Sequence, residues 1–106
     1  MRTPLRVHGP AALSNAAATK YTVPANSKYV LRHIHVYNPG AGTVNFTASI
    51  GADAAGTRIY DAIPVLEDVP FEKWCYFVLE ETEIFQALGS VNNQCVLTLD
   101  GDLITL

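Results

Sequence analysis

Apolar and polar residues alternate strictly along residues 43–50, and this alternation is the clearest pattern in the sequence. Successive side chains of a β-strand point to opposite faces of its sheet, so alternation is typical of a strand with one buried and one solvated face. The pattern therefore predicts a strand whose apolar side chains enter a core. The apolar residues are Val44, Phe46, Ala48 and Ile50, and the polar ones are Thr43, Asn45, Thr47 and Ser49.

A second strand is predicted over residues 29–37, which are rich in β-branched and aromatic residues. The connection between the two strands, residues 38–42, contains a proline and two glycines, which favour a turn. We therefore expect residues 29–50 to form a long antiparallel hairpin at the centre of the fold.

The first strand of this expected hairpin has an irregular pattern. Leu31 and Ile34 are both apolar, but on a regular strand they would point to opposite faces. Either a bulge near Arg32 and His33 shifts the phase of the strand, or both of its faces are partly covered.

Further strands follow at intervals of roughly 8–12 residues with turn residues between them, and no segment has a convincing helical period. This spacing predicts an all-β fold of about eight short strands, an antiparallel β-sandwich of jelly-roll type, with a small closed barrel as the alternative. Pro64 makes the strand that begins near residue 57 short or places it at a sheet edge. The run Asp100-Gly101-Asp102 favours a tight hairpin turn. The expected strands are residues 20–23, 29–37, 43–50, 57–61, 71–79, 84–88, 94–99 and 103–106.

The N-terminal segment carries the weakest pattern. Pro4, Gly9 and Pro10 interrupt regular structure, and the small residues that follow them show no amphipathic period. We expect an N-terminal arm or edge strand over residues 1–19, followed by a single β-sandwich domain over residues 20–106.

The core of such a sandwich is formed by apolar residues on the facing sides of its two sheets. Residues 71–79 are apolar at almost every position, which indicates a strand covered on both faces or a strand with one face in an interface. The expected core residues are Ile34, Val36, Val44, Phe46, Ala48, Ile50, Leu97 and Leu99.

The charge of the chain narrows the classes of function. The formal net charge is −3, and the seven basic residues form no cluster, so we expect no nucleic-acid binding. Charged residues make up 16% of the chain, below the usual ~25%, which hints that part of the surface is covered by partners. No stretch approaches the ~20 apolar residues of a membrane span, and no signal peptide is evident, so a soluble protein is expected.

The sequence offers no strong candidate for catalysis or metal binding. Cys75 and Cys95 lie in expected strands and are interpreted as buried free thiols, with a disulfide as the alternative. His33 and His35 would share one face of a regular strand, but no third metal ligand is marked. No nucleophile motif or phosphate-binding loop is present. We therefore expect no cofactor, no metal and no enzymatic activity.

Four stretches of the chain stand out as more specific than a general β pattern. They are Tyr21-Thr22-Val23-Pro24-Ala25, Ile34-His35-Val36-Tyr37-Asn38, residues 49–61 (SIGADAAGTRIYD) and residues 79–87 (LEETEIFQA). These stretches resemble a family of small β proteins encoded by tailed bacteriophages among their virion structural genes. The resemblance covers about residues 21–99, and its most specific part is the block from Ser49 to Arg58. The N-terminal segment departs from the family.

The resemblance implies a structural protein of the virion, made in the cytoplasm of the bacterial host. We expect a capsid decoration or cement protein that binds the shell by protein–protein contacts, as a homo-oligomer. The major capsid protein or tail proteins would be its partners. The alternatives are a tail or head-to-tail component, including a carbohydrate-binding module at the tail tip.

The expected partner contacts lie in the segment before Thr19, on one face of residues 71–79 and on two further tyrosines. The segment before Thr19 is a candidate because arms often decide where a virion protein docks. Aromatic rings are enriched at interface hot spots, and tyrosine hydroxyls favour water or a partner. The candidate contact residues are Leu5, Val7, Leu13, Tyr37, Tyr60, Trp74 and Tyr76.

Overall fold

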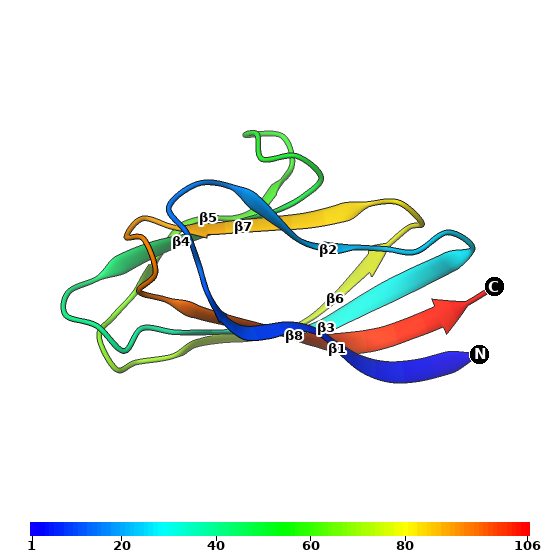
Figure 1. The fold of residues 1–106 in the computed structure, drawn as a ribbon, viewed down its shortest axis with the longest axis horizontal. Helices are drawn as coiled ribbons and strands as arrows, with labels where there is room; N and C mark the ends of the chain where they lie inside the picture. Colours follow the sequence, from blue (N-terminus) through cyan, green and yellow to red (C-terminus); the bar gives the residue numbers. More distant parts are fainter.

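The computed structural model, which describes residues 1–106, is built of strands alone (Figure 1). The all-β prediction is therefore confirmed, with eight strands. No helix of a length and hydrophobicity that would let it cross a membrane occurs in the structure. The strands are β1 (Arg2–Ala12), β2 (Ala18–Thr22), β3 (Ser27–Tyr37), β4 (Val44–Ile50), β5 (Arg58–Val65), β6 (Phe71–Leu79), β7 (Ile84–Gly89) and β8 (Val96–Thr105).

The strands form two four-stranded sheets that pack face to face (Figure 1). The strand order is β1-β8-β3-β6 in the first sheet and β2-β7-β4-β5 in the second. Every neighbouring pair is antiparallel. This order, in which the chain repeatedly crosses between two sheets, is that of a jelly roll, so the predicted β-sandwich is confirmed.

The prediction of a central hairpin over residues 29–50 is wrong. Strand β3 pairs with β6 and β8, whereas β4 pairs with β5 and β7 in the other sheet. The turn after Tyr37 therefore carries the chain across the sandwich. Asn38 fixes this crossing, because its buried side-chain amide donates hydrogen bonds to the carbonyl oxygens of Gly42 (2.8 Å) and Val65 (3.0 Å).

The irregularity in β3 is a bulge, as one of the two alternatives predicted. The pairing of β3 with both neighbours shifts register between Leu31 and His33. At this point β3 has one residue more than β8, which lets Leu31 and Ile34 both lie in the core.

The predicted turn at residues 100–102 does not exist, because β8 runs through it from Val96 to Thr105. Gly101 lies in the middle of the sheet, where an added Cβ would collide with the carbonyl oxygen of Val30 and approach the hydroxyl of Tyr29 at 2.8 Å. The glycine is needed for this close approach, and it does not form a turn. The two expected strands at the C-terminus are therefore one strand.

The core lies between the sheets and contains the predicted residues, except that Ile50 is only partly buried. Leu13, expected to contact a partner, is completely buried in this core, and that expectation is corrected here. It follows β1 at the point where the chain turns into the sandwich, and its backbone N–H donates a hydrogen bond to the Cys95 carbonyl oxygen (2.8 Å).

The N-terminal segment is part of the first sheet. Residues 2–12 form β1, the edge strand that pairs with β8. The expected boundary at residue 19 falls inside β2, which begins at Ala18 and pairs with β7.

Candidate functional site

Exposed apolar side chains concentrate on strand β6, at one edge of the first sheet. Trp74 is 77% exposed, Tyr76 is 67% exposed and Val78 is 43% exposed. These three residues alternate along the strand, so they share its outward face, and we call them the β6 ridge. The strand was expected to be covered on both faces or to have one face in an interface; in the isolated chain one face is bare.

The other face of β6 enters the sandwich. Phe71, Cys75 and Phe77 pack against the core, and Leu79 is part of it. The same apolar strand therefore supplies both core and surface, which explains why its sequence lacks alternation.

The rings of the ridge are supported by side chains of the neighbouring strand β3. The Trp74 ring stacks on His33 with ring centroids 4.2 Å apart. The Arg32 guanidinium carbon lies 5.6 Å from the centre of the Tyr76 ring, within range of a cation–π interaction. These contacts limit the motion of the rings before any partner arrives, which lowers the entropy cost of binding.

His33 is flanked by two carboxylates. Its Nε2 atom lies 3.0 Å from Glu72 Oε1, although the two are not aligned as a hydrogen bond, and its Nδ1 atom lies 3.6 Å from Asp100 Oδ2. Carboxylates of β6 and β8 thus border the imidazole on which Trp74 stacks.

An ion cluster on the same sheet lies beside the ridge. Asp102 on β8 accepts hydrogen bonds from Arg2 on β1 (2.6 Å) and from Arg32 on β3 (2.8 Å). The hydrogen bond from Arg2 holds the pKa of the Asp102 carboxyl below its usual value, and that from Arg32 acts in the same direction against the opposing effect of desolvation. The cluster joins three strands and positions Arg32 beside Tyr76.

The predicted contact residues do not form one surface. Trp74 and Tyr76 lie on the β6 ridge, whereas Leu5 is partly exposed on β1 at the opposite edge of the same sheet. Val7 packs against the core. The sequence did not identify Val78 as a contact residue, although it lies in the apolar run at 71–79. The supporting role of His33 and Arg32 had no signal in the sequence.

The two remaining tyrosines are engaged within the chain. The Tyr37 hydroxyl donates a hydrogen bond of 2.8 Å to Asp68, and this bond raises the pKa of Tyr37. Tyr60 packs edge-on against Phe71, with ring centroids 5.5 Å apart. Neither presents a free aromatic face comparable to that of Trp74.

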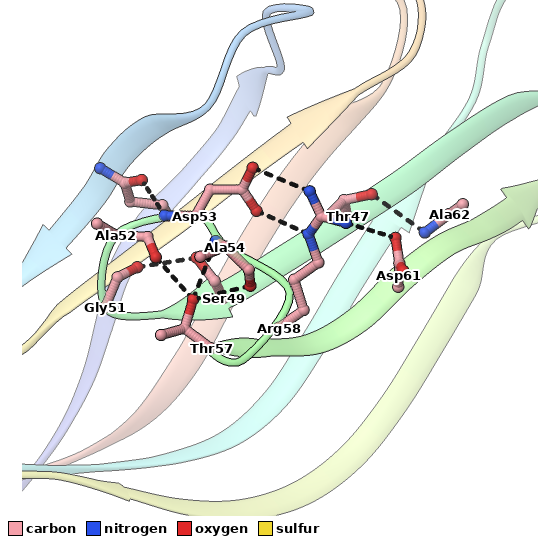
Figure 2. Close-up of polar contacts among 11 residues, drawn as sticks. Thr47, Ser49, Gly51, Ala52, Asp53, Ala54, Thr57, Arg58, Asp61 and Ala62 are labelled. Atoms are coloured by element: carbon pink, nitrogen blue, oxygen red, sulfur yellow. Dashed lines mark hydrogen bonds and ion pairs between the residues drawn. The ribbon is translucent and has the colours of Figure 1, made fainter.

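The 51–57 loop, which lies in the most specific block of the phage resemblance, is closed by its own polar groups (Figure 2). Arg58 donates to Asp53 at 2.9 Å and lies 3.3 Å from Asp61. The Thr57 hydroxyl donates to the Ala52 carbonyl oxygen (2.6 Å), and the Asp53 backbone N–H donates to Gln86 on β7 (3.0 Å). The hydrogen bond from Arg58 lowers the pKa of Asp53. These contacts indicate a structural loop that folds over β4 and β7.

Other types of site have little support. No three His, Cys, Asp or Glu side chains gather in a way that could hold a metal ion. Cys75 and Cys95 are unpaired, and burial raises the pKa of both thiols. The one hollow in the structure is too narrow for a water molecule and lies between apolar side chains and two tyrosines; its lining is Val7, Tyr21, Tyr29, Leu31, Leu79, Phe85 and Leu99.

Comparison with known proteins supports the fold. No protein-family model matches this sequence, and no curated protein is significantly similar to it. A solved protein structure from Bacillus endospore appendages, described as forming "a novel family of disulfide-linked pili", is similar with a TM-score of 0.53 and 15% identity. The similarity covers 100% of this chain and 86% of that one. This chain is therefore a β-sandwich protein of jelly-roll topology with an exposed aromatic ridge on one edge strand.

Proposed function

We propose that this chain is a structural protein of a tailed-phage virion that binds the capsid shell through the β6 ridge. The observation that carries the proposal is the ridge itself, in which Trp74, Tyr76 and Val78 are exposed side by side on an ordered strand. The resemblance of residues 21–99 to phage structural proteins supports the setting. The similar fold of a pilus subunit adds that such a sandwich can serve in an assembly.

The physical basis of the function is burial of the ridge against a neighbouring subunit. Burial of one large apolar side chain is worth roughly 1.5–3 kcal/mol, so one ridge gives a modest contact after the costs of association. Many copies on one shell add their contributions, which stabilises the particle as a cement would. Arg32 lies beside the Tyr76 ring, and Glu72 and Asp100 flank His33, on which Trp74 stacks. An apolar centre bordered by polar groups is typical of protein interfaces. This role requires no catalysis and no cofactor.

The test is binding to particles that lack the chain. A Trp74→Ala/Tyr76→Ala variant should bind such particles at least about tenfold more weakly than the wild type, as expected for the loss of hot-spot aromatics. The matched control is Leu66→Ala/Val69→Ala, which removes exposed apolar side chains outside β6 and should bind normally. A ridge variant that stays folded and binds as well as the wild type would refute the ridge as the contact.

The position in the particle is tested separately by immunoelectron microscopy of intact virions. Label over the head supports the decoration role. Label at the tail would replace it by a tail or head-to-tail role, and particles without label would refute a virion protein.

A carbohydrate-binding function is the second candidate. It is favoured by one observation, the exposed ring of Trp74, which stacks on a histidine flanked by the carboxylates of Glu72 and Asp100, since sugars bind aromatic faces near polar groups. A glycan array should then show binding that is lost in Trp74→Ala. An array without hits would eliminate this candidate.

A further inference from the structure

Strand β6 also has a free backbone edge, which is distinct from its outward-facing ridge. It is the last strand of the order β1-β8-β3-β6, so the backbone groups on the side away from β3 have no strand partner. Free edges pair readily with other chains, and natural proteins blunt them with proline, bulges or short length.

The other three edges of the sandwich are blunted in this way. Strand β1 contains Pro4 and Pro10 and two register shifts. Strand β2 has five residues and a register shift. Strand β5 contains Pro64, two register shifts and a positive φ of 50° at Ala62. Strand β6 has nine residues without a proline or a positive φ. Its pairing with β3 shifts register once, opposite Leu31 and His33, where β6 has one residue more than β3. Its residues still alternate regularly between outward and inward from Trp74 to Leu79.

We propose that β6 pairs antiparallel with β6 of a second copy of this chain about a two-fold axis. The two four-stranded sheets would then join into one sheet of eight strands. The other edges of a second copy are unsuited to this pairing, because β1 and β5 contain proline and β2 has only five residues. Pairing of β6 with a different edge would also be head-to-tail and form open chains, whereas pairing of β6 with itself closes the dimer. The inference stands apart from the proposed function, because it concerns the purified chain without particles.

The sequence of β6 suits this pairing in one register. Residues that face each other across an antiparallel pair point to the same side of the sheet. All nine residues find a partner only when Cys75 lies on the two-fold axis. Trp74 of each copy then faces Tyr76 of the other, which forms two aromatic cross-strand pairs on the outward face.

The charges of β6 are compatible with the same register. Glu72 would face Val78 of the second copy, and Lys73 would face Phe77. No two like charges are directly opposite each other, so the pairing carries no direct repulsion.

The test introduces charges at the paired positions in the full chain. Trp74→Lys/Tyr76→Lys places lysine opposite lysine twice, and Trp74→Glu/Tyr76→Glu places glutamate opposite glutamate twice. In sedimentation experiments the wild type should form dimers, and each variant alone should associate at least about tenfold more weakly. An equimolar mixture of the two variants should regain the dimer, because each lysine then faces a glutamate. Leu66→Lys/Val69→Lys is the matched control and should dimerise like the wild type.

The opposing outcomes are equally defined. A wild type that stays monomeric at about 1 mM, the weak end of specific association, would overturn the inference. Species that grow beyond a dimer with concentration would also overturn it. Folded variants that dimerise alone, or whose mixture stays monomeric, would refute the register.

A measurement on the wild type avoids any risk that a variant fails to fold. In a dimer of one isotope-labelled and one unlabelled copy, NMR contacts between the rings of Trp74 and Tyr76 of different copies are expected. A dimer without such contacts would refute the pairing.

Discussion

Arg32 Nε on β3 donates a hydrogen bond of 2.8 Å to Asp102 Oδ2 on the adjacent strand β8. Arg2 on β1 donates to the same oxygen, so one carboxylate links three of the four strands of the first sheet. The carboxylate is little exposed, and such a group is costly unless it is paired. The two arginines therefore allow an aspartate to lie within a central strand.

The first prediction concerns the pH dependence of this cluster. The hydrogen bond from Arg2, supported by that from Arg32, places the folded-state pKa of Asp102 below the unfolded value of about 3.9. The contribution of Asp102 to stability is therefore complete above the unfolded pKa and is lost as the pH falls through the folded pKa. Asp102→Asn should be less stable than the wild type at pH 7, and this difference should shrink at pH 3. Urea unfolding at pH 7 and pH 3 measures this difference in the free energy of unfolding. Asp61→Asn, on the other sheet, is the control for the loss of one charge.

The second prediction concerns the glycine next to Asp102. Gly101→Ala should lower the free energy of unfolding by about 1–3 kcal/mol or more, because the new methyl group meets the Val30 carbonyl oxygen in the middle of the sheet. Gly56→Ala is the matched control, because its added Cβ has no atom within 4 Å. Urea unfolding of both variants measures the difference. Equal stabilities of the two variants would contradict the close approach of the Val30 carbonyl oxygen to Gly101.

The third prediction separates a core residue from a partner contact. Leu13→Ala should destabilise the isolated chain by about 2–5 kcal/mol, since it opens a cavity in the core. Leu66→Ala should have little effect, because Leu66 is 53% exposed. Thermal and urea unfolding of the purified chain suffice. If Leu13→Ala were as stable as the wild type, the burial of Leu13 in the core would be refuted.

The fourth prediction concerns the crossing between the sheets. The buried side chain of Asn38 donates to two carbonyl oxygens and accepts hydrogen bonds from Gly40 N–H (3.1 Å) and Gln94 Nε2 (2.9 Å). Asn38→Ala leaves these groups without their partner and should cost about 2–4 kcal/mol. Asn45→Ala, at an exposed position of β4, is the control. If both changes cost the same in urea unfolding, the amide does not hold the crossing.

The sequence predicted the parts of the fold that depend on local pattern. Alternation at residues 43–50 identified core residues such as Val44 and Phe46, and the broken phase at Leu31 and Ile34 gave a bulge as one of two alternatives. Alternation tells which face of a strand is buried, but it carries no information on which strand lies beside it. The expected hairpin was wrong for this reason, because a short connection serves equally well within a sheet or between two sheets.

The remaining errors arise from contacts between distant residues. Asp100-Gly101-Asp102 has the local chemistry of a turn, but Arg2 and Arg32, which stabilise Asp102 inside a strand, lie 100 and 70 residues away in sequence. Of the candidate site, Trp74 and Tyr76 could be proposed from residue type alone. Their exposure depends on β6 being an edge strand, which is a property of the whole topology.

The two ends of the chain lie together at one end of the sandwich (Figure 1). The Met1 amino group donates a hydrogen bond of 3.1 Å to the Thr105 carbonyl oxygen, and strands β1 and β8 run side by side. Strand β6 lies at the opposite edge of the same sheet. A fluorescent protein or antigen fused to either end would thus leave β6 free, and a β6-paired dimer would carry two such cargoes at its outer edges, as a small display scaffold requires.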